Sequence, residues 1–141
     1  MRGSEDPVDV DTLLEAASPA VLTVYRANGE AVVSPVWFRR HDDAIEVVLA
    51  TADRKLEHLR HDPRCVLLVF ETDPPFRGLR VRGQADPTPD VDARARLAIA
   101  SRYLGSESGR RYADLSRRPA GVVLRLPLAG ARTWDLTDSL N

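Results

Sequence analysis

The chain has 141 residues, a formal net charge of -1 and 43% hydrophobic residues, which is typical of one globular domain with a core of its own. The near-neutral charge argues against a dedicated nucleic-acid-binding protein, which normally carries a clear basic excess. No apolar run approaches the roughly 20 residues that a membrane-spanning helix needs.

The composition also bears on the compartment and the source. The N-terminal stretch MRGSEDPVDVD is acidic and has no apolar segment of the kind found in signal peptides. The single cysteine, Cys65, has no partner for a disulfide within the chain. We therefore expect a cytoplasmic protein without membrane or nucleic-acid partners. Nineteen arginines beside one lysine, Lys55, indicate a GC-rich bacterial genome, and we favour an actinobacterial one.

The first half of the chain is predicted to hold two helices and three strands. Residues 1–8 are expected to be a flexible lead-in, followed by a single domain over residues 9–141. Apolar residues at helical spacing predict a helix over residues 9–17. β-branched residues and turn signals predict strands that pair as an antiparallel meander, with a turn after each of the first two. These strands are 20–26, 30–38 and 44–50, the turns are 27–29 and 39–43, and a short helix follows over 53–61.

The second half is predicted to alternate strands and helices. In chain order we expect a buried strand over 65–71, a strand over 76–86, a helix over 90–104, a loop over 105–109, a short helix over 110–115, a strand over 121–126 and a terminal strand or arm over 131–136. Six strands at such short spacing favour a closed or nearly closed antiparallel barrel.

A candidate anion site begins at the single lysine. If a helix starts near Asp53, then Arg54 and Lys55 lie in its first turn, where two positive charges oppose the helix dipole. A bound phosphate would explain them, because free N–H groups, the dipole and two cations would converge on it. Thr51 would add a hydroxyl donor. The alternative is a solvated basic turn whose lysine pairs with Asp53 or Glu57, and spacing alone does not separate the two interpretations.

Four segments follow one another in an order that resembles a known family. They are VLTVYRANGEAVVSPVWF, DRKLEHLRHDPRCVLLV, LRVRGQAD and VVLRLPLAGARTWDL. Together they resemble the flavin-binding split-barrel family related to pyridoxamine 5'-phosphate oxidase, and the last is similar to the closing strand of its short actinobacterial, F-420-dependent members. The resemblance spans nearly the whole chain and implies a mainly β fold with α insertions, a six-stranded antiparallel split β-barrel.

The resemblance implies a cofactor site. In that family the phosphate of FMN, or the polar tail of the deazaflavin coenzyme F-420, sits on the Arg-Lys turn, which implies Lys55 and Arg54 as anion ligands. The ring system lies against the second and third strands at a dimer interface. This implicates Ser34, Pro35, Val36, Trp37, Leu49, Ala50 and Thr51. Pro35 cannot donate a ladder hydrogen bond, which fits either an opening for a planar ligand or a simple edge strand.

The resemblance therefore predicts a homodimeric oxidoreductase. A hydride would pass between coenzyme F-420, our first choice, or FMN and a small organic substrate, with no obligate catalytic side chain and no metal ligand. Pyridoxamine phosphate oxidases proper carry a C-terminal substrate-binding segment that this chain lacks, and Gly78 stands where some relatives place a polar side chain. The alternatives are a non-catalytic FMN- or haem-binding split-barrel protein and a redox-silent interaction protein.

A few further residues were weighed individually. Trp37 either walls the ring pocket or packs in the core or at a dimer interface. Trp134 either reaches the partner's site from the C-terminal arm or, as we favour, packs at an interface. His58 and His61 lie three residues apart on one predicted helix, but without a third ligand we interpret them as solvated histidines or as histidines paired with Asp62. Cys65 is expected to be an inert core thiol. Four arginines are interpreted either as attracting an anionic coenzyme tail or as a solvated run, and these are Arg110, Arg111, Arg117 and Arg118.

Overall fold

The computed structural model describes residues 9–136. The lead-in expected to be flexible, residues 1–8, and residues 137–141 lie outside the described residues. Strands dominate the described chain and helices are inserted between them, so the predicted mainly β class with α insertions is confirmed. No helix in this part of the chain is both long and apolar enough to span a membrane.

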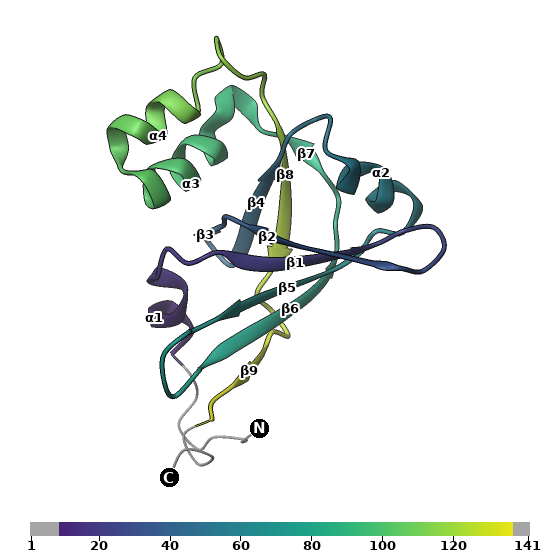
Figure 1. Ribbon diagram of the computed structural model, residues 1–141, viewed down its shortest axis with the longest axis vertical. Helices are drawn as coiled ribbons and strands as arrows, with labels where there is room; N and C mark the ends of the chain where they lie inside the picture. The colour runs from purple at the N-terminus through teal and green to yellow at the C-terminus, as the bar shows by residue number, and fades with distance from the viewer. Residues whose placement is uncertain (1–8, 137–141) are drawn as a thin grey trace.

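The strands form two antiparallel sheets. The larger has the spatial order β2 (Ala31–Val36), β1 (Ala20–Tyr25), β5 (Arg64–Phe70), β6 (Gly78–Gln84) and β9 (Arg132–Trp134). The smaller has the order β3 (Arg39–His41), β4 (Ala44–Leu49), β8 (Val122–Pro127) and β7 (Thr88–Pro89). The sheets cross in Figure 1 and, over the described residues, do not close into one barrel. The six-stranded barrel is not confirmed, because β3, β7 and β9 join the six predicted strands and each sheet keeps its own edges.

The chain changes sheet between β2 and β3. β1 and β2 form the predicted hairpin, whose turn places Gly29 at a φ of 89°, a conformation that glycine adopts without strain. β4 then pairs with β3 and β8, not with β2. The predicted three-strand meander is therefore wrong at its third strand, and residues 39–41, predicted as a turn, are a strand.

The hydrophobic core lies between the two sheets. Alternate side chains of β1, β5 and β6 point inward, as the alternation of apolar residues along each strand requires. β4 is buried on both faces over its first four residues. The largest fully buried side chains are Phe38, Leu22, Ile45, Leu67, Leu79, Leu124 and Leu126.

Of the four α-helices, α1 precedes the first strand and the other three are inserted between strands. α1 (Val10–Glu15) and α2 (Arg54–His61) occupy the positions predicted for them, and Asp9 and Asp53 cap their N-termini. α3 (Arg94–Leu104) begins later than predicted, after a 3-10 turn, η1 (Val91–Ala93). The predicted loop over 105–109 is wrong, because α4 (Ser106–Tyr112) starts there and packs against α3.

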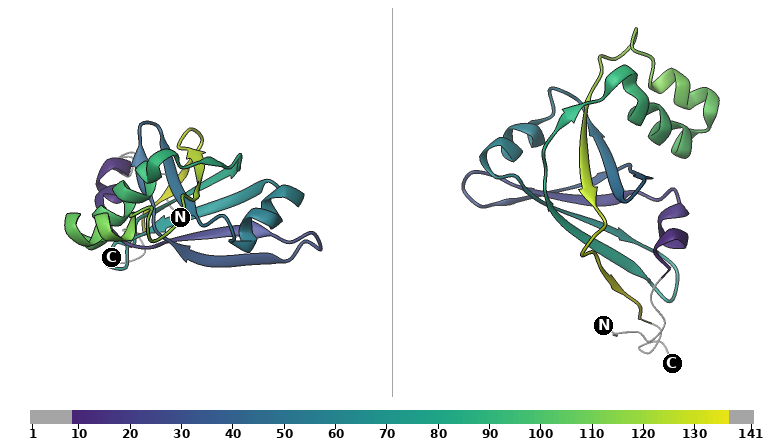
Figure 2. Two further views of the ribbon diagram at one scale, coloured as in Figure 1. Left: turned by 90° about the horizontal axis from the view of Figure 1, so that it is seen from above. Right: turned by 180° about the vertical axis from the view of Figure 1, so that it is seen from behind.

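The α3–α4 hairpin projects from the sheets as a separate lobe, green in Figure 1 and seen from behind in Figure 2. Its anchors are polar. Arg102 donates to the carbonyls of Leu14 and Ala16 at 2.6 and 2.7 Å, which satisfies the end of α1. The Tyr103 hydroxyl donates to the carbonyl of Ser18 at 2.8 Å and accepts from the backbone N–H of Phe38 at 3.3 Å. The hairpin is thereby fixed beside the point where the chain changes sheet.

Candidate functional site

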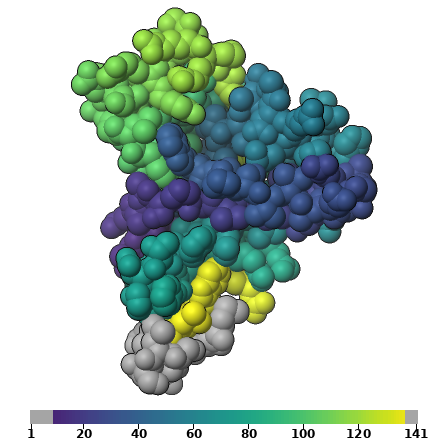
Figure 3. Space-filling view, viewed as in Figure 1, coloured from purple at the N-terminus to yellow at the C-terminus, as the bar shows by residue number. Residues whose placement is uncertain are grey.

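A cavity of about 500 Å³ lies where the sheets meet the α3–α4 hairpin. Its size falls within the range of about 300–1,000 Å³ that is usual for small-molecule sites. Figure 3 shows the α3–α4 lobe and the segment that leads into α2 standing on either side of this region. The cavity is lined by Pro35, Val36, Trp37, Val48, Leu49, Ala50, Thr51, Ala52, Asp53, Lys55, Arg96, Ile99, Ala100, Tyr112, Arg118, Pro119 and Gly121.

Six of the eight residues predicted to bind the cofactor line this cavity, namely Pro35, Val36, Trp37, Ala50, Thr51 and Lys55. Leu49, implicated by the same resemblance, joins them. Ser34 and Arg54 do not line it. The Ser34 hydroxyl is buried without a hydrogen-bond partner among the described residues, and Arg54 is exposed at the first position of α2. The fold thus brings most of the predicted set together, and the role of each residue toward a cofactor stays a prediction.

Lys55 folds back onto the residue that caps its own helix. Its Nζ lies 3.2 Å from Oδ2 of Asp53, and its backbone N–H donates to Oδ1 of the same carboxylate at 2.9 Å. The Lys55 side chain is 17% exposed, so it is held along the cavity wall and does not extend into solvent. Of the two interpretations left open by spacing, the ligand-free geometry matches the paired turn. An incoming anion would have to share Lys55 with Asp53.

Pro35 lies near the end of β2, which is an edge strand of the larger sheet. An edge strand tolerates a residue that lacks an N–H donor, so the simple interpretation of Pro35 holds. Pro35 also lines the cavity, so its flat ring forms part of the surface that a planar ligand would meet. The two interpretations of this proline are therefore compatible.

An aromatic stack joins the residue that follows β2 to the hairpin, and two of its rings, Trp37 and Tyr112, line the cavity. Trp37 lies parallel to Tyr103, with ring centroids 4.9 Å apart and an interplanar angle of 7°. Tyr112 meets Trp37 at 5.7 Å with a tilt of 45°. The guanidinium of Arg118 lies over the ring of Tyr112, 4.4 Å from its centroid. Cation–π contact of this kind fixes the orientation of an arginine at a surface.

Arg96 is a buried cation at the same end of the cavity. It is 8% exposed and donates to three carbonyl oxygens, those of Pro119 at 2.6 Å, Ala113 at 3.0 Å and Arg118 at 3.2 Å. Its Nε is buried and has no partner among the described residues. Arg96 thus ties the segment that follows α4 to α3.

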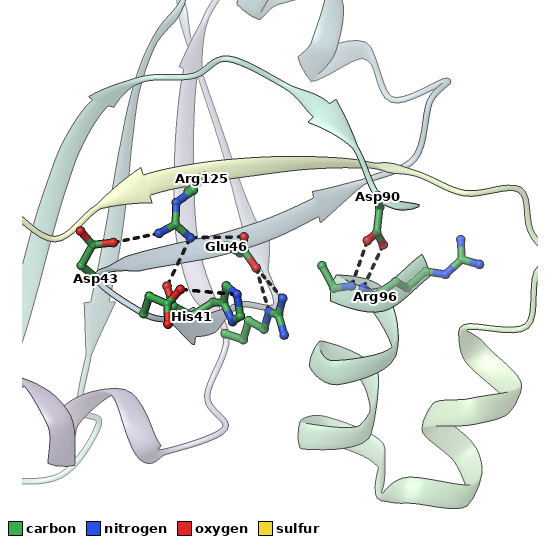
Figure 4. A network of polar contacts seen from close by, with 9 residues as sticks. His41, Asp43, Glu46, Asp90, Arg96 and Arg125 are labelled. Carbon is green, nitrogen blue, oxygen red and sulfur yellow. Dashed lines mark hydrogen bonds and ion pairs between the residues drawn. The ribbon is translucent and has the colours of Figure 1, made fainter. Parts of the chain in front are cut away.

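Two carboxylates organise the polar contacts seen in Figure 4. Asp90 is 3% exposed and accepts from the backbone N–H groups of Ala95 and Arg96 at 2.9 and 3.0 Å, so it caps α3 from a distance. Glu46 pairs with Arg39 at 2.8 Å and lies 3.5 Å from Arg125. Neither carboxylate lines the cavity, so both contribute to the framework and not to the site.

Of the four arginines named from the sequence, Arg118 lines this cavity, and Arg110, Arg111 and Arg117 do not. Apart from Trp37, the other residues weighed individually lie outside the lining. His58, His61 and Cys65 do not line it, and the described residues contain no cluster of three or more side chains suited to hold a metal. Trp134 packs inside its own chain against Gly78, where an added Cβ would lie 2.2 Å from the indole ring. The missing side chain at Gly78 is therefore explained by this tryptophan.

Sequence reasoning missed the part of the cavity that the hairpin supplies. Arg96, Ile99 and Tyr112 all come from α3 and α4, and nothing in the four resembling segments covers these helices. One signal was available: Arg96 interrupts the otherwise apolar buried face of α3. A buried arginine needs several acceptors, so it usually marks a fixed polar contact.

The chain matches one protein-family model and is similar to several solved structures. The family model described as pyridoxamine 5'-phosphate oxidase matches residues 8–135. A conserved hypothetical protein from Mycobacterium tuberculosis superposes with a TM-score of 0.80 at 19% identity, covering 99% of this chain and 92% of that one. An F420 reductase superposes with a TM-score of 0.68 at 26% identity, covering 86% and 94%. A haem storage protein from Vibrio cholerae superposes with a TM-score of 0.64 at 14% identity, covering 88% and 91%.

No curated protein matches the chain. The similarity to the mycobacterial and Vibrio structures bears on the fold alone, because the identities are low. The family model, in contrast, extends over nearly all of the sequence. The chain therefore belongs to the pyridoxamine 5'-phosphate oxidase family, whose members include flavin-binding proteins.

Proposed function

We propose that the protein is an oxidoreductase that transfers a hydride between bound coenzyme F-420, or FMN as the second choice, and a small organic substrate. One observation carries the proposal: most of the residues that the family resemblance assigns to the coenzyme line a single cavity that ends at Lys55. The similarity to an F420 reductase at 26% identity supports the first choice of coenzyme.

The chemistry of the cavity fits a coenzyme that is planar at one end and anionic at the other. Pro35, Val36 and Leu49 offer apolar surface to a ring system, and Lys55 with the start of α2 offers a cation and a helix N-terminus to a phosphate. When bound, the coenzyme supplies two electrons and a proton as a hydride, and the protein supplies binding and orientation.

The side chains of the cavity act by holding and shielding. Thr51 and Lys55 would fix the phosphate, and Trp37 would close the ring region against water. Among the described residues, Asp53, which pairs with Lys55, is the only carboxylate that lines the cavity, and the two histidines of α2 do not line it. The proposal therefore needs no acid or base from the protein, and a proton from solvent completes the reduction of the substrate.

The homodimer is part of the proposal, and the outer face of the larger sheet supports it. Val33 is 62% exposed on the edge strand β2. Val33 and Pro35 pair with Thr23 and Val21 in register, so all four side chains lie on the face of the sheet opposite the core. Exposed apolar surface on an edge strand invites a partner. A second copy seated there would reach the cavity edge at Pro35.

The haem-binding alternative receives less support. A haem site needs an axial ligand to the iron. The candidates named from the sequence, His58 and His61, do not line the cavity. A non-catalytic FMN-binding protein differs from the leading proposal only in turnover. Reduction of an added acceptor by the coenzyme-loaded protein separates these two.

The test is a binding titration of the full chain with F-420, FMN and haemin. Lys55→Ala is expected to weaken coenzyme binding by about tenfold or more, because a charge-assisted hydrogen bond contributes about 1.5–3 kcal/mol and 1.4 kcal/mol is tenfold. Arg60→Ala, which removes an exposed cation from the last turn of the same helix, is the matched control and should leave binding unchanged. Absence of micromolar binding for both F-420 and FMN contradicts the proposal, and equal affinity of Lys55→Ala contradicts the placement of the phosphate.

A further inference from the structure

The cations that line the cavity differ in whether they pair with a carboxylate. At the α2 end, Lys55 is neutralised by Asp53. At the α3–α4 end, Arg96 and Arg118 both line the cavity, and no described carboxylate lies within ion-pair distance of either. The excess charge therefore sits at the hairpin end, away from the lysine to which the coenzyme phosphate is assigned.

At the α3–α4 end of the cavity, the buried guanidinium of Arg96 holds the backbone of the segment that follows α4. Arg96 binds the carbonyls of Arg118 and Pro119 and keeps its unpartnered Nε buried. A buried cation without a carboxylate is costly, and an anion bound nearby would lower that cost. Three carbonyl oxygens therefore meet the Arg96 guanidinium, and no ion pair does so among the described residues.

Arg118 presents its guanidinium beside a flat aromatic surface. One of its terminal nitrogens donates to the carbonyl of Tyr112 at 3.0 Å, and the remaining N–H groups have no hydrogen-bond partner among the described residues. The fork of an arginine matches the two oxygens of a carboxylate. Tyr112 is 37% exposed and lies next to Trp37. Arg118 covers one face of Tyr112 and Tyr103 covers one face of Trp37, so a ligand in this wall meets the opposite ring faces.

We propose that the α3–α4 end of the cavity is the substrate subsite and that it takes a planar, conjugated organic carboxylate. Arg118 binds the carboxylate, and Tyr112 and Trp37 stack on the conjugated system. The inference rests on the proposed function for its redox step. When bound in reduced form, the coenzyme would supply a hydride for one carbon of a conjugated double bond and would itself be oxidised, and solvent would supply the proton for the other carbon.

The test compares trans-cinnamate with neutral trans-cinnamamide by calorimetry, using the full chain with and without its coenzyme. Cinnamate is expected to bind about tenfold or more tightly than the amide, because only the carboxylate accepts a charge-assisted bidentate contact. Arg118→Ala should abolish that difference while leaving amide binding and coenzyme affinity unchanged. Arg117→Ala, a neighbouring exposed arginine outside the cavity lining, is the matched control and should behave as wild type.

Each outcome separates the subsite from the proposed function. Equal binding of cinnamate by the wild-type chain and Arg118→Ala overturns the subsite. Loss of coenzyme affinity in Arg118→Ala also overturns it, because Arg118 would then belong to the coenzyme. If cinnamate binds through Arg118 but neither F-420 nor FMN binds, the anion subsite stands and the proposed redox function fails.

Discussion

The two β-sheets and the α3–α4 hairpin are held in place by different interactions. The main hydrophobic cluster includes buried side chains from β1, β4, β5, β6, β8, α1 and α2, and none from α3 or α4. The hairpin is fixed by directional polar contacts, through Asp90, Arg96, Arg102 and Tyr103, and by the stack on Trp37. Burial of apolar side chains stabilises the two sheets, whereas a few hydrogen bonds hold the α3–α4 hairpin, which lines the part of the cavity that we propose for the substrate.

This difference implies that the two regions respond differently to mutation. Loss of a buried side chain in the sheets removes contacts on all sides and lowers the stability of the whole domain. Loss of one polar anchor is expected to loosen the hairpin first, because its buried apolar side chains, such as Ile99 and Ala100, lie outside the main hydrophobic cluster. We therefore expect substitutions in the hairpin anchors to affect the sheets less than substitutions in the main cluster do.

The largest expected effect is on the sheets. Leu67 is fully buried in β5, so Leu67→Ala should lower the free energy of unfolding by about 2–5 kcal/mol. Urea unfolding followed by far-UV circular dichroism measures it. Leu115→Ala, at a position that is 47% exposed, is the control and should change stability by less than about 0.5 kcal/mol. Equal effects at the two positions would contradict the assignment of the core.

A smaller and more local effect is expected at the hairpin. Asp90→Ala leaves two backbone N–H groups buried without an acceptor, which costs about 1–3 kcal/mol. Asp90→Asn keeps one acceptor oxygen and should lose less. The fluorescence of Trp37, isolated by Trp134→Phe, should report release of the hairpin at a lower urea concentration than the loss of β-structure. Coincident transitions would show that the hairpin and the sheets unfold as one unit.

The sheets were the more predictable region for a physical reason. Alternation of buried and exposed side chains along β1, β5 and β6 is visible in the sequence, so the strands were located closely. Their partners were less predictable, because β4 is buried on both faces and its side chains do not distinguish β2 from β8 as a neighbour. Pairing between strands distant in the chain depends on the whole fold.

The hairpin was predicted poorly because its determinants are long-range. The segment SESG reads as a loop by composition, but it opens α4. The contact of Arg96 with the carbonyl of Pro119 joins positions that no helical period relates. The sequence resemblance therefore identified the half of the cavity lined by residues 35–37, 49–51 and Lys55, and missed most of the half formed by α3 and α4.

The smallest effect concerns Cys65, whose thiol lies on β5 and is 1% exposed. Burial raises the pKa of this thiol from 9.0 to about 11. Because the thiolate is the reactive form, Cys65 should react slowly with Ellman's reagent at about pH 8 and faster as the pH rises toward its folded pKa. The raised pKa also means that the protonated thiol favours the folded state below pH 9.0, and that this contribution is lost as the pH rises to about 11.

The labelling rate of Cys65 tests whether the sheets and the α3–α4 hairpin unfold independently. Leu67→Ala should accelerate labelling of Cys65, because it weakens the sheets in which the thiol is buried. Asp90→Ala should leave the labelling rate close to that of the wild-type chain, because the cluster that buries Cys65 contains no side chain of α3 or α4. A labelling rate in Asp90→Ala as high as in Leu67→Ala would mean that the polar anchors of the hairpin also hold the sheets together, and the division between a buried framework and a polar-anchored lobe would have to be abandoned.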